Sequence, residues 1–234
     1  MRCGAIWLAG SRDMFANWRF ERALRPLKHH ANPTLKSFGN ADWPDRSTRL
    51  DEAPYLALDF ELDGLSKDAH LLQAGWLPFE GRNIALCRAQ SFDIRSDAEL
   101  NAKAVTIHGI GEQRAARGDK ISNVIEALIN SLSGRIMIAH AAGIEQHALQ
   151  RAAKAVFGVS LPVRCICTLR LERQIHPNLV GSEAYRLGPS RERYGLPDYS
   201  AHDALTDAIA AAELFQAQIS RMPANSTLAE VEAA

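Results

Sequence analysis

The sequence predicts an α/β fold in which helices cover the faces of one mixed β-sheet. Strand-like apolar segments come first along the chain, and later strands alternate with segments of helical periodicity. A chain of 234 residues is long enough to bury one sizeable core. These observations favour a single α/β domain with a small appendage.

Five segments have the composition of strands. The first, Tyr55–Phe60, ends in an acidic pair, and the turn at residues 80–83 joins the second, Leu71–Phe79, to the third, Ile84–Ile94. Two shorter apolar runs follow, Arg135–Ala139 and Val163–Cys167. We therefore expect a five-stranded sheet.

Helices are expected around and after the later strands. Pro189 lies inside the fifth helical segment, where a proline disfavours a continuous helix. The six segments are Asn101–Val105, Ile121–Leu132, Ile144–Phe157, Thr168–Gln174, Ser182–Tyr194 and His202–Arg221.

The chain divides into an N-terminal extension (1–52), a main domain (53–222) and a flexible tail (223–234). Residues 1–50 carry nine Lys/Arg against four Asp/Glu, and residues 1–52 hold Trp7, Trp18 and Trp43. A helix is plausible around Asp13–Leu27. Aromatic anchoring of the extension and a nucleic-acid-binding arm both remain open.

Composition limits the possible surroundings of the protein. Lys+Arg and Asp+Glu balance at 27 each, so no overall charge points to nucleic acid or membrane. No apolar run approaches the ~20 residues of a membrane span. Four cysteines without a CxxC pair and an N-terminus without a signal-peptide pattern favour the cytoplasm.

Two carboxylates lie side by side on the first predicted strand. Asp59 and Glu61 are two residues apart, so their side chains share one face. Like charges this close repel each other unless a cation neutralises them. The pair therefore indicates a metal site.

Two further acids lie towards the apolar faces of their predicted helices. Glu145 shares a face with Leu149, and Asp207 lies about 60° from the centre of its apolar stripe by helical geometry. A buried carboxylate needs a partner. Either a metal ion or a buried arginine would serve.

His202 precedes Asp207 by five residues, so the two do not share a helical face. We place His202 at the entry of the helix, over the acidic site. Asp203 suits the N-cap of the same helix better than a metal site.

The order of these residues resembles that of the DEDDh 3′–5′ exonucleases, the family of the proofreading epsilon subunit of DNA polymerase III. The first motif stands at residues 59–65 (DFELDGL), an IHGI segment at 107–110, and the third motif at 202–208 (HDALTDA). The second motif departs from the family pattern. Ala141 replaces an asparagine, and Glu145 replaces the usual aspartate.

The resemblance implies an RNase H-like fold and two divalent ions, Mg²⁺ or Mn²⁺. Asp59, Glu61 and Asp207 would bind the metals with Glu145 as a weaker ligand, and His202 would be the general base. The residues implied to hold the terminal nucleotide are Leu62, Leu65, His108, Gly109 and Ile110.

The implied activity is release of nucleoside monophosphates from 3′ ends of single-stranded nucleic acid, either DNA or RNA. An exoribonuclease that trims short RNA fits the same acids. A binding or scaffold protein with weakened catalysis is the alternative that Glu145 and Ala141 suggest. A polymerase partner is possible, but the sequence does not indicate one.

Overall fold

The computed structural model describes residues 5–64, 69–96 and 100–232. Within these residues, six strands form one mixed sheet in the order β3-β2-β1-β5-β6, with β4 also paired to β2. β1 is antiparallel to β2 and parallel to β5, and β5 is parallel to β6. The strands are β1 (Pro54–Leu62), β2 (Leu71–Glu80), β3 (Asn83–Ile84), β4 (Gln90–Asp93), β5 (Ile136–Ala139) and β6 (Cys165–Cys167). The predicted α/β class with a mixed sheet is confirmed.

The prediction of five strands is wrong by one, because the predicted strand Ile84–Ile94 is interrupted. Ile84 pairs with Phe79 and Gln90 pairs with Trp76, so this segment advances six residues while β2 advances three. The surplus residues form a short 3-10 helix, η1 (Leu86–Arg88). Pro78, which has no N–H to donate, lies in the same interval of β2.

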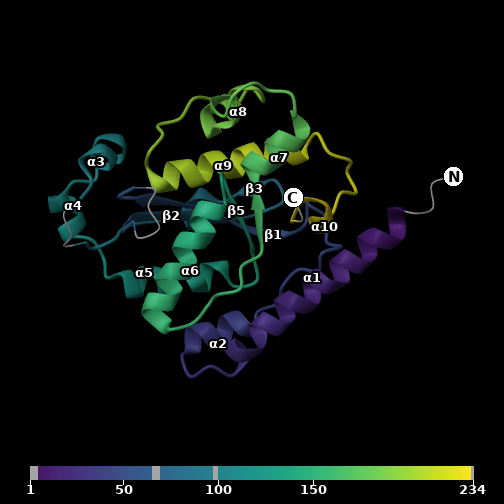
Figure 1. Ribbon diagram of the computed structural model, residues 1–234, viewed down its shortest axis with the longest axis horizontal. Coiled ribbons are helices and arrows are strands. Elements are labelled where there is room, and N and C mark those ends of the chain that lie inside the picture. Colours follow the sequence, from purple (N-terminus) through teal and green to yellow (C-terminus); the bar gives the residue numbers. More distant parts are fainter. Residues whose placement is uncertain (1–4, 65–68, 97–99, 233–234) are drawn as a thin grey trace.

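Helices cover both faces of the sheet. α9 lies on one face, and α5 and α6 lie on the other (Figure 1). None of the described helices combines the length and the apolar composition required to cross a lipid bilayer. The helices are α1 (Ala5–Lys28), α2 (Pro33–Gly39), α3 (Ala102–His108), α4 (Glu112–Ala116), α5 (Ile121–Leu132), α6 (Gly143–Phe157), α7 (Thr168–Ile175), α8 (Leu187–Glu192), α9 (Ala204–Ile219) and α10 (Leu228–Glu232).

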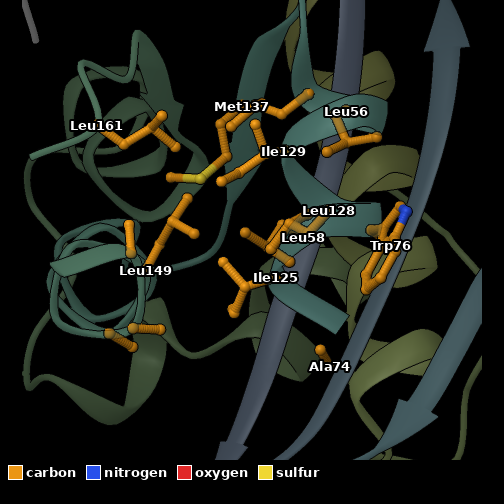
Figure 2. Packing of buried hydrophobic residues seen from close by; sticks show 14 of the residues in the cluster. Leu56, Leu58, Ala74, Trp76, Ile125, Leu128, Ile129, Met137, Leu149 and Leu161 are labelled. Atoms are coloured by element: carbon orange, nitrogen blue, oxygen red, sulfur yellow. The ribbon is translucent and has the colours of Figure 1, made fainter. Parts of the chain in front are cut away.

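Alternate residues of β1 face opposite layers of the core. Leu56 and Leu58 pack towards α5 and β5, among Ile125, Leu128 and Met137 (Figure 2). The intervening residues face α9 in a second core, whose members include Tyr55, Ala57, Ala208, Ala212 and Phe215. By the same alternation, Asp59 and Glu61 continue the row that faces α9.

The N-terminal helices share the core beneath α5. Leu24 and Leu27 of α1 and Leu35 of α2 are buried there. Trp43 packs edge-to-face against Phe20 of α1, at a ring-centroid distance of 5.0 Å. Apolar packing therefore holds the described part of the extension on the domain.

The C-terminal segment is also packed, where a flexible tail is expected from the sequence. Leu228 and Val231 of α10 are buried in the core under α9. Glu232 forms ion pairs with Arg46 at 3.0 Å and with Arg164 at 2.7 Å. The C-terminal segment thus connects the extension to the residue that precedes β6.

Candidate active site

Three carboxylates converge where the C-terminal end of β1 meets the first turn of α9. Asp59, Glu61 and Asp207 each offer an oxygen, and these oxygens lie within 4.8 Å of one another. Asp59 and Glu61 come from one face of β1, as their spacing predicts. The carboxyl end of parallel strands is the usual position of sites in α/β folds.

A glycine in β2 allows α9 to approach this closely. Gly75 pairs with Asp59, and a Cβ placed on Gly75 would lie 2.2 Å from the backbone nitrogen of Leu205 and 2.3 Å from the carbonyl carbon of Ala204. The first turn of α9 therefore rests directly on the backbone of β2. This contact brings Asp207 to the strand that carries the other two acids.

Gln73 fixes the start of α9 to β2. Its Oε1 accepts a hydrogen bond from the backbone N–H of Ala204 at 2.9 Å, and its Nε2 donates to Asp203 at 3.2 Å. Asp203 in turn accepts from the backbone N–H of Thr206 at 3.1 Å, which confirms it as the N-cap of α9. Burial raises the pKa of Asp203, but these hydrogen bonds outweigh burial and hold it below its usual value.

Burial and mutual repulsion raise the pKa values of the three clustered acids. The pKa of Asp59 lies well above its usual value, because the carboxyl is buried and other acids surround it. Burial, with the charges of Asp207 and Asp203, raises the pKa of Glu61 to about 7. Burial also raises the pKa of Asp207, and the hydrogen bonds that it accepts offset this only in part. A bound cation would relieve this repulsion, so the donor set fits a hard divalent ion.

Glu145 lies in the first turn of α6, beside the three clustered acids. Its side chain is buried, and burial raises its pKa to about 8. The charge of Glu145 is the largest charge contribution to the raised pKa of Asp59, so the two carboxylates are neighbours. Oε2 of Glu145 has no hydrogen-bond partner in the described part of the chain.

The alternative of a buried arginine partner for these acids is not found. Among the described residues, no arginine forms an ion pair with Asp59, Glu61, Glu145 or Asp207. Four neighbouring acids without an arginine or lysine ion pair in the described part of the chain favour the metal interpretation over the structural one.

The loop before α9 supplies two groups that bind Asp207. The backbone N–H of His202 donates to Oδ2 of Asp207 at 2.8 Å, and the residue is exposed. His202 has a φ of 70°, in the left-handed region. The Tyr199 hydroxyl also forms a hydrogen bond with Asp207. We did not predict Tyr199 from the sequence, because only the folded loop brings it to Asp207.

The second motif contributes a fixed histidine rather than a mobile one. Nδ1 of His140 lies 2.9 Å from Oγ1 of Thr168, and Nε2 lies 2.9 Å from the carbonyl oxygen of Tyr185. Burial lowers the pKa of His140 to about 4, so the ring is neutral. Ala141 follows with a φ of 65°, which asparagine, the usual family residue there, adopts more readily than alanine.

The residues expected to hold a nucleotide fall into different environments. Leu62 is partly buried beside a β-bulge. His108 ends α3, and burial with the charges of Arg114 and His202 lowers its pKa, so the charge of His202 reaches this ring. Gly109 has a φ of 67° at the C-cap of α3. Leu65 lies outside the described residues.

Ile110 does not offer its side chain to a ligand. It is fully buried in a small cluster with Leu72, Leu100 and Ala115. Stacking of a base on Ile110 is therefore inconsistent with the structure. Its backbone N–H donates to Nδ1 of His108 at 3.1 Å and orients that ring.

The fold and the acidic cluster together define a nuclease-like site. The chain matches the RNase_T exonuclease family over residues 56–215, more than half of its length, and it belongs to this family. The motifs and the fold confirm the expected relationship to the DEDDh exonucleases of the RNase H-like superfamily.

Similar proteins include a DNA polymerase III PolC-type from Thermotoga maritima. It is 27% identical over 165 residues, which cover 70% of this chain and 12% of the polymerase. The chain thus spans about an eighth of the length of that relative.

Solved structures of exonucleases share the fold. E. coli exonuclease I in complex with a dT13 oligonucleotide superposes with a TM-score of 0.63 at 18% identity, covering 74% of this chain and 42% of the other. Exonuclease X in complex with 5′-overhanging duplex DNA gives a TM-score of 0.60 at 21% identity, covering 76% and 99%.

Proposed function

We propose that this protein is a metal-dependent 3′–5′ exonuclease that releases nucleoside monophosphates from single-stranded nucleic acid. The observation that carries the proposal is the cluster of Asp59, Glu61 and Asp207, with oxygens within 4.8 Å and no arginine partner among the described residues. Membership of the exonuclease family supports the same reaction class.

Each acid has a distinct role in this proposal. Asp59, Glu61 and Asp207 would hold the divalent ions, Mg²⁺ or Mn²⁺, and Asp59 would be the ligand that the other acids surround. Glu145 contributes from the neighbouring helix. Bound divalent ions supply Lewis acidity, which lowers the pKa of the attacking water and stabilises charge on the leaving 3′ oxygen.

His202 is the general base of the proposed reaction. Its backbone N–H is bonded to Asp207, so the imidazole is carried beside the acids while the residue stays exposed. A ring nitrogen of His202 accepts the proton of the attacking water, and the leaving 3′ oxygen acquires a proton from solvent. Exposure allows the imidazole to return its proton to bulk water after each turnover.

The proposed function is tested by following mononucleotide release from single strands that carry a 3′ label, with Mg²⁺ or Mn²⁺. His202→Ala is expected to lower kcat by roughly 10²- to 10⁴-fold, the usual contribution of general-base catalysis. A matched control is His147→Ala, an exposed histidine of α6. If wild-type protein releases no mononucleotide with either metal, the exonuclease function is wrong and the nucleic-acid-binding alternative remains.

Glu145 determines the metal preference in this proposal. Its side chain is one methylene longer than the aspartate of the family, and Mg²⁺ tolerates distorted octahedral geometry poorly. We expect Glu145→Asp to raise the ratio of Mg²⁺- to Mn²⁺-supported activity by several-fold. Glu126→Asp, on α5, is the control. Equal wild-type activity in both metals would remove this hypothesis.

The nature of the sugar is a separate question. The DNA-bound neighbours, exonucleases I and X, favour DNA as the first substrate to test. A trimming exoribonuclease uses the same acids, so parallel assays on DNA and RNA strands of equal sequence separate the two.

A further inference from the structure

A cavity of about 640 Å³ adjoins the acidic cluster on the side of β5 and β6. Its lining is mainly apolar, with Leu169, Leu187 and Leu196 as large side chains. Asp207 and His202 are also part of the lining, so the cavity is continuous with the proposed catalytic site. Its volume lies in the range of pockets that bind small organic groups, roughly 300–1,000 Å³.

The cavity and the residues around His108 lie on opposite sides of β1. In the sheet, β1 stands between β2 and β5. The helix that ends at His108 follows β4, which pairs with β2. The cavity is lined by His140, directly after β5, and by Leu169, just after β6. A chain that crosses the acidic cluster therefore meets α3 on one side and the cavity on the other.

Tyr199 forms a fixed wall of the cavity. Its hydroxyl is bonded to Asp207, and the guanidinium of Arg191 lies 5.0 Å from the centre of its ring. Arg191 is itself buried, and it donates to the carbonyl oxygens of Ala210 at 2.8 Å and Pro197 at 3.0 Å. The aromatic ring is thus held in place by both neighbours. Fixed aromatic rings are common platforms for nucleobases.

We propose that this cavity binds the nucleoside on the 5′ side of the scissile phosphodiester, the one whose 3′ oxygen is the leaving group. The proposal rests on the proposed exonuclease function. The released nucleotide occupies the α3 side, beside His108. The remaining strand then leaves through the cavity, where its terminal base contacts the leucine side chains and Tyr199.

Two substrates separate this subsite from the catalytic cluster. A single-stranded oligothymidylate occupies both sides of the scissile bond. Thymidine 5′-(4-nitrophenyl phosphate) supplies only the nucleotide to be released, with nitrophenolate in place of the 5′ neighbour. Inhibition by thymidine 5′-monophosphate reports on the released-nucleotide side alone.

The test compares wild type with the Leu187→Ala/Leu196→Ala double variant in Mn²⁺. We expect kcat/KM for the oligonucleotide to fall about tenfold relative to kcat/KM for the nitrophenyl ester, since only the oligonucleotide places a base against the two leucines. The inhibition constant of the monophosphate should change less than twofold. Leu86→Ala, which changes an exposed leucine in η1, is the control. It should leave the ratio of the two kcat/KM values at the wild-type value.

The outcomes are distinguishable. A folded double variant with the wild-type ratio of kcat/KM values for the two substrates would overturn the proposed subsite. Equal losses of kcat/KM on both substrates, together with weaker inhibition by the monophosphate, would overturn it as well. Where the double variant fails to fold, the same ratio is measured for Leu187→Ala alone, and we expect it to fall about threefold. Wild-type protein that is inert on both substrates would overturn the proposed function itself.

Discussion

Asparagine in place of Asp59 is expected to lower nucleotide release by roughly 10³-fold, because a lost ligand removes several kcal/mol of metal-based stabilisation. The same substitution is expected to stabilise the metal-free protein at pH 8. Asp59 is buried and the other acids surround it, so a neutral asparagine avoids both the cost of a buried charge and the repulsion by its neighbours. We expect a gain of about 2 kcal/mol, which corresponds to a melting temperature about 6 °C higher.

The sign of the pH dependence follows from the raised pKa values. Glu61 and Glu145 have pKa values of about 7 and about 8 in the folded protein, above the ordinary value of 4.5. Between pH 4.5 and about pH 8, the folded protein binds more protons than the unfolded chain. The stability of the metal-free protein therefore falls as the pH rises through this range. Mn²⁺ should restore stability at pH 8 in wild type, and its effect should be much smaller in Asp59→Asn.

Thermal unfolding at pH 5.5 and pH 8, with and without Mn²⁺, measures both effects. Asp51→Asn is the control, because this exposed carboxylate forms only a solvent-screened surface ion pair with Arg49. A metal-free Asp59→Asn protein that melts below wild type at pH 8 would show that the cluster is not under electrostatic strain.

Alanine in place of Gly75 is expected to separate the acids of β1 from Asp207. The added Cβ would lie 2.2–2.4 Å from backbone atoms of Ala204 and Leu205, and a helix backbone cannot move aside as a side chain can. We expect a destabilisation of roughly 3 kcal/mol from overpacking. Displacement of Asp207 by about 1 Å would lower activity roughly 10²-fold.

Activity and melting temperature of Gly75→Ala should be compared with those of Gly111→Ala. Gly111 precedes α4 with a φ of −84°, and a Cβ there meets no atom within 4 Å. The control should keep the wild-type activity and melting temperature. Full activity in Gly75→Ala would contradict the proposed role of this close contact.

The acids were predictable from the sequence because their positions follow local rules. Asp59 and Glu61 share a strand face because side chains alternate with a period of two. Asp203 and Asp207 lie at the N-cap and in the first turn of one predicted helix. Local periodicity needs no knowledge of distant contacts. The same rules predicted most strands and helices of the domain.

The remaining features depend on contacts between distant segments. Gly75, in a strand of mainly large and apolar residues, could have indicated a close backbone approach, although not by which helix. No local pattern shows that Tyr199 reaches Asp207, or that Gln73 binds the start of α9. Likewise, the packing of Glu232 against Arg46 depends on residues from opposite ends of the chain.

The central claim is that Asp59, Glu61 and Asp207 together hold catalytic divalent ions. Anomalous diffraction from a crystal soaked with Mn²⁺ and a nucleoside monophosphate tests it most directly. We expect Mn²⁺ peaks bound by these three carboxylates, with the nucleotide phosphate beside them, and the same map will show whether Glu145 reaches a metal. A fully soaked crystal with no Mn²⁺ between β1 and the first turn of α9 would show that these carboxylates do not form a metal site.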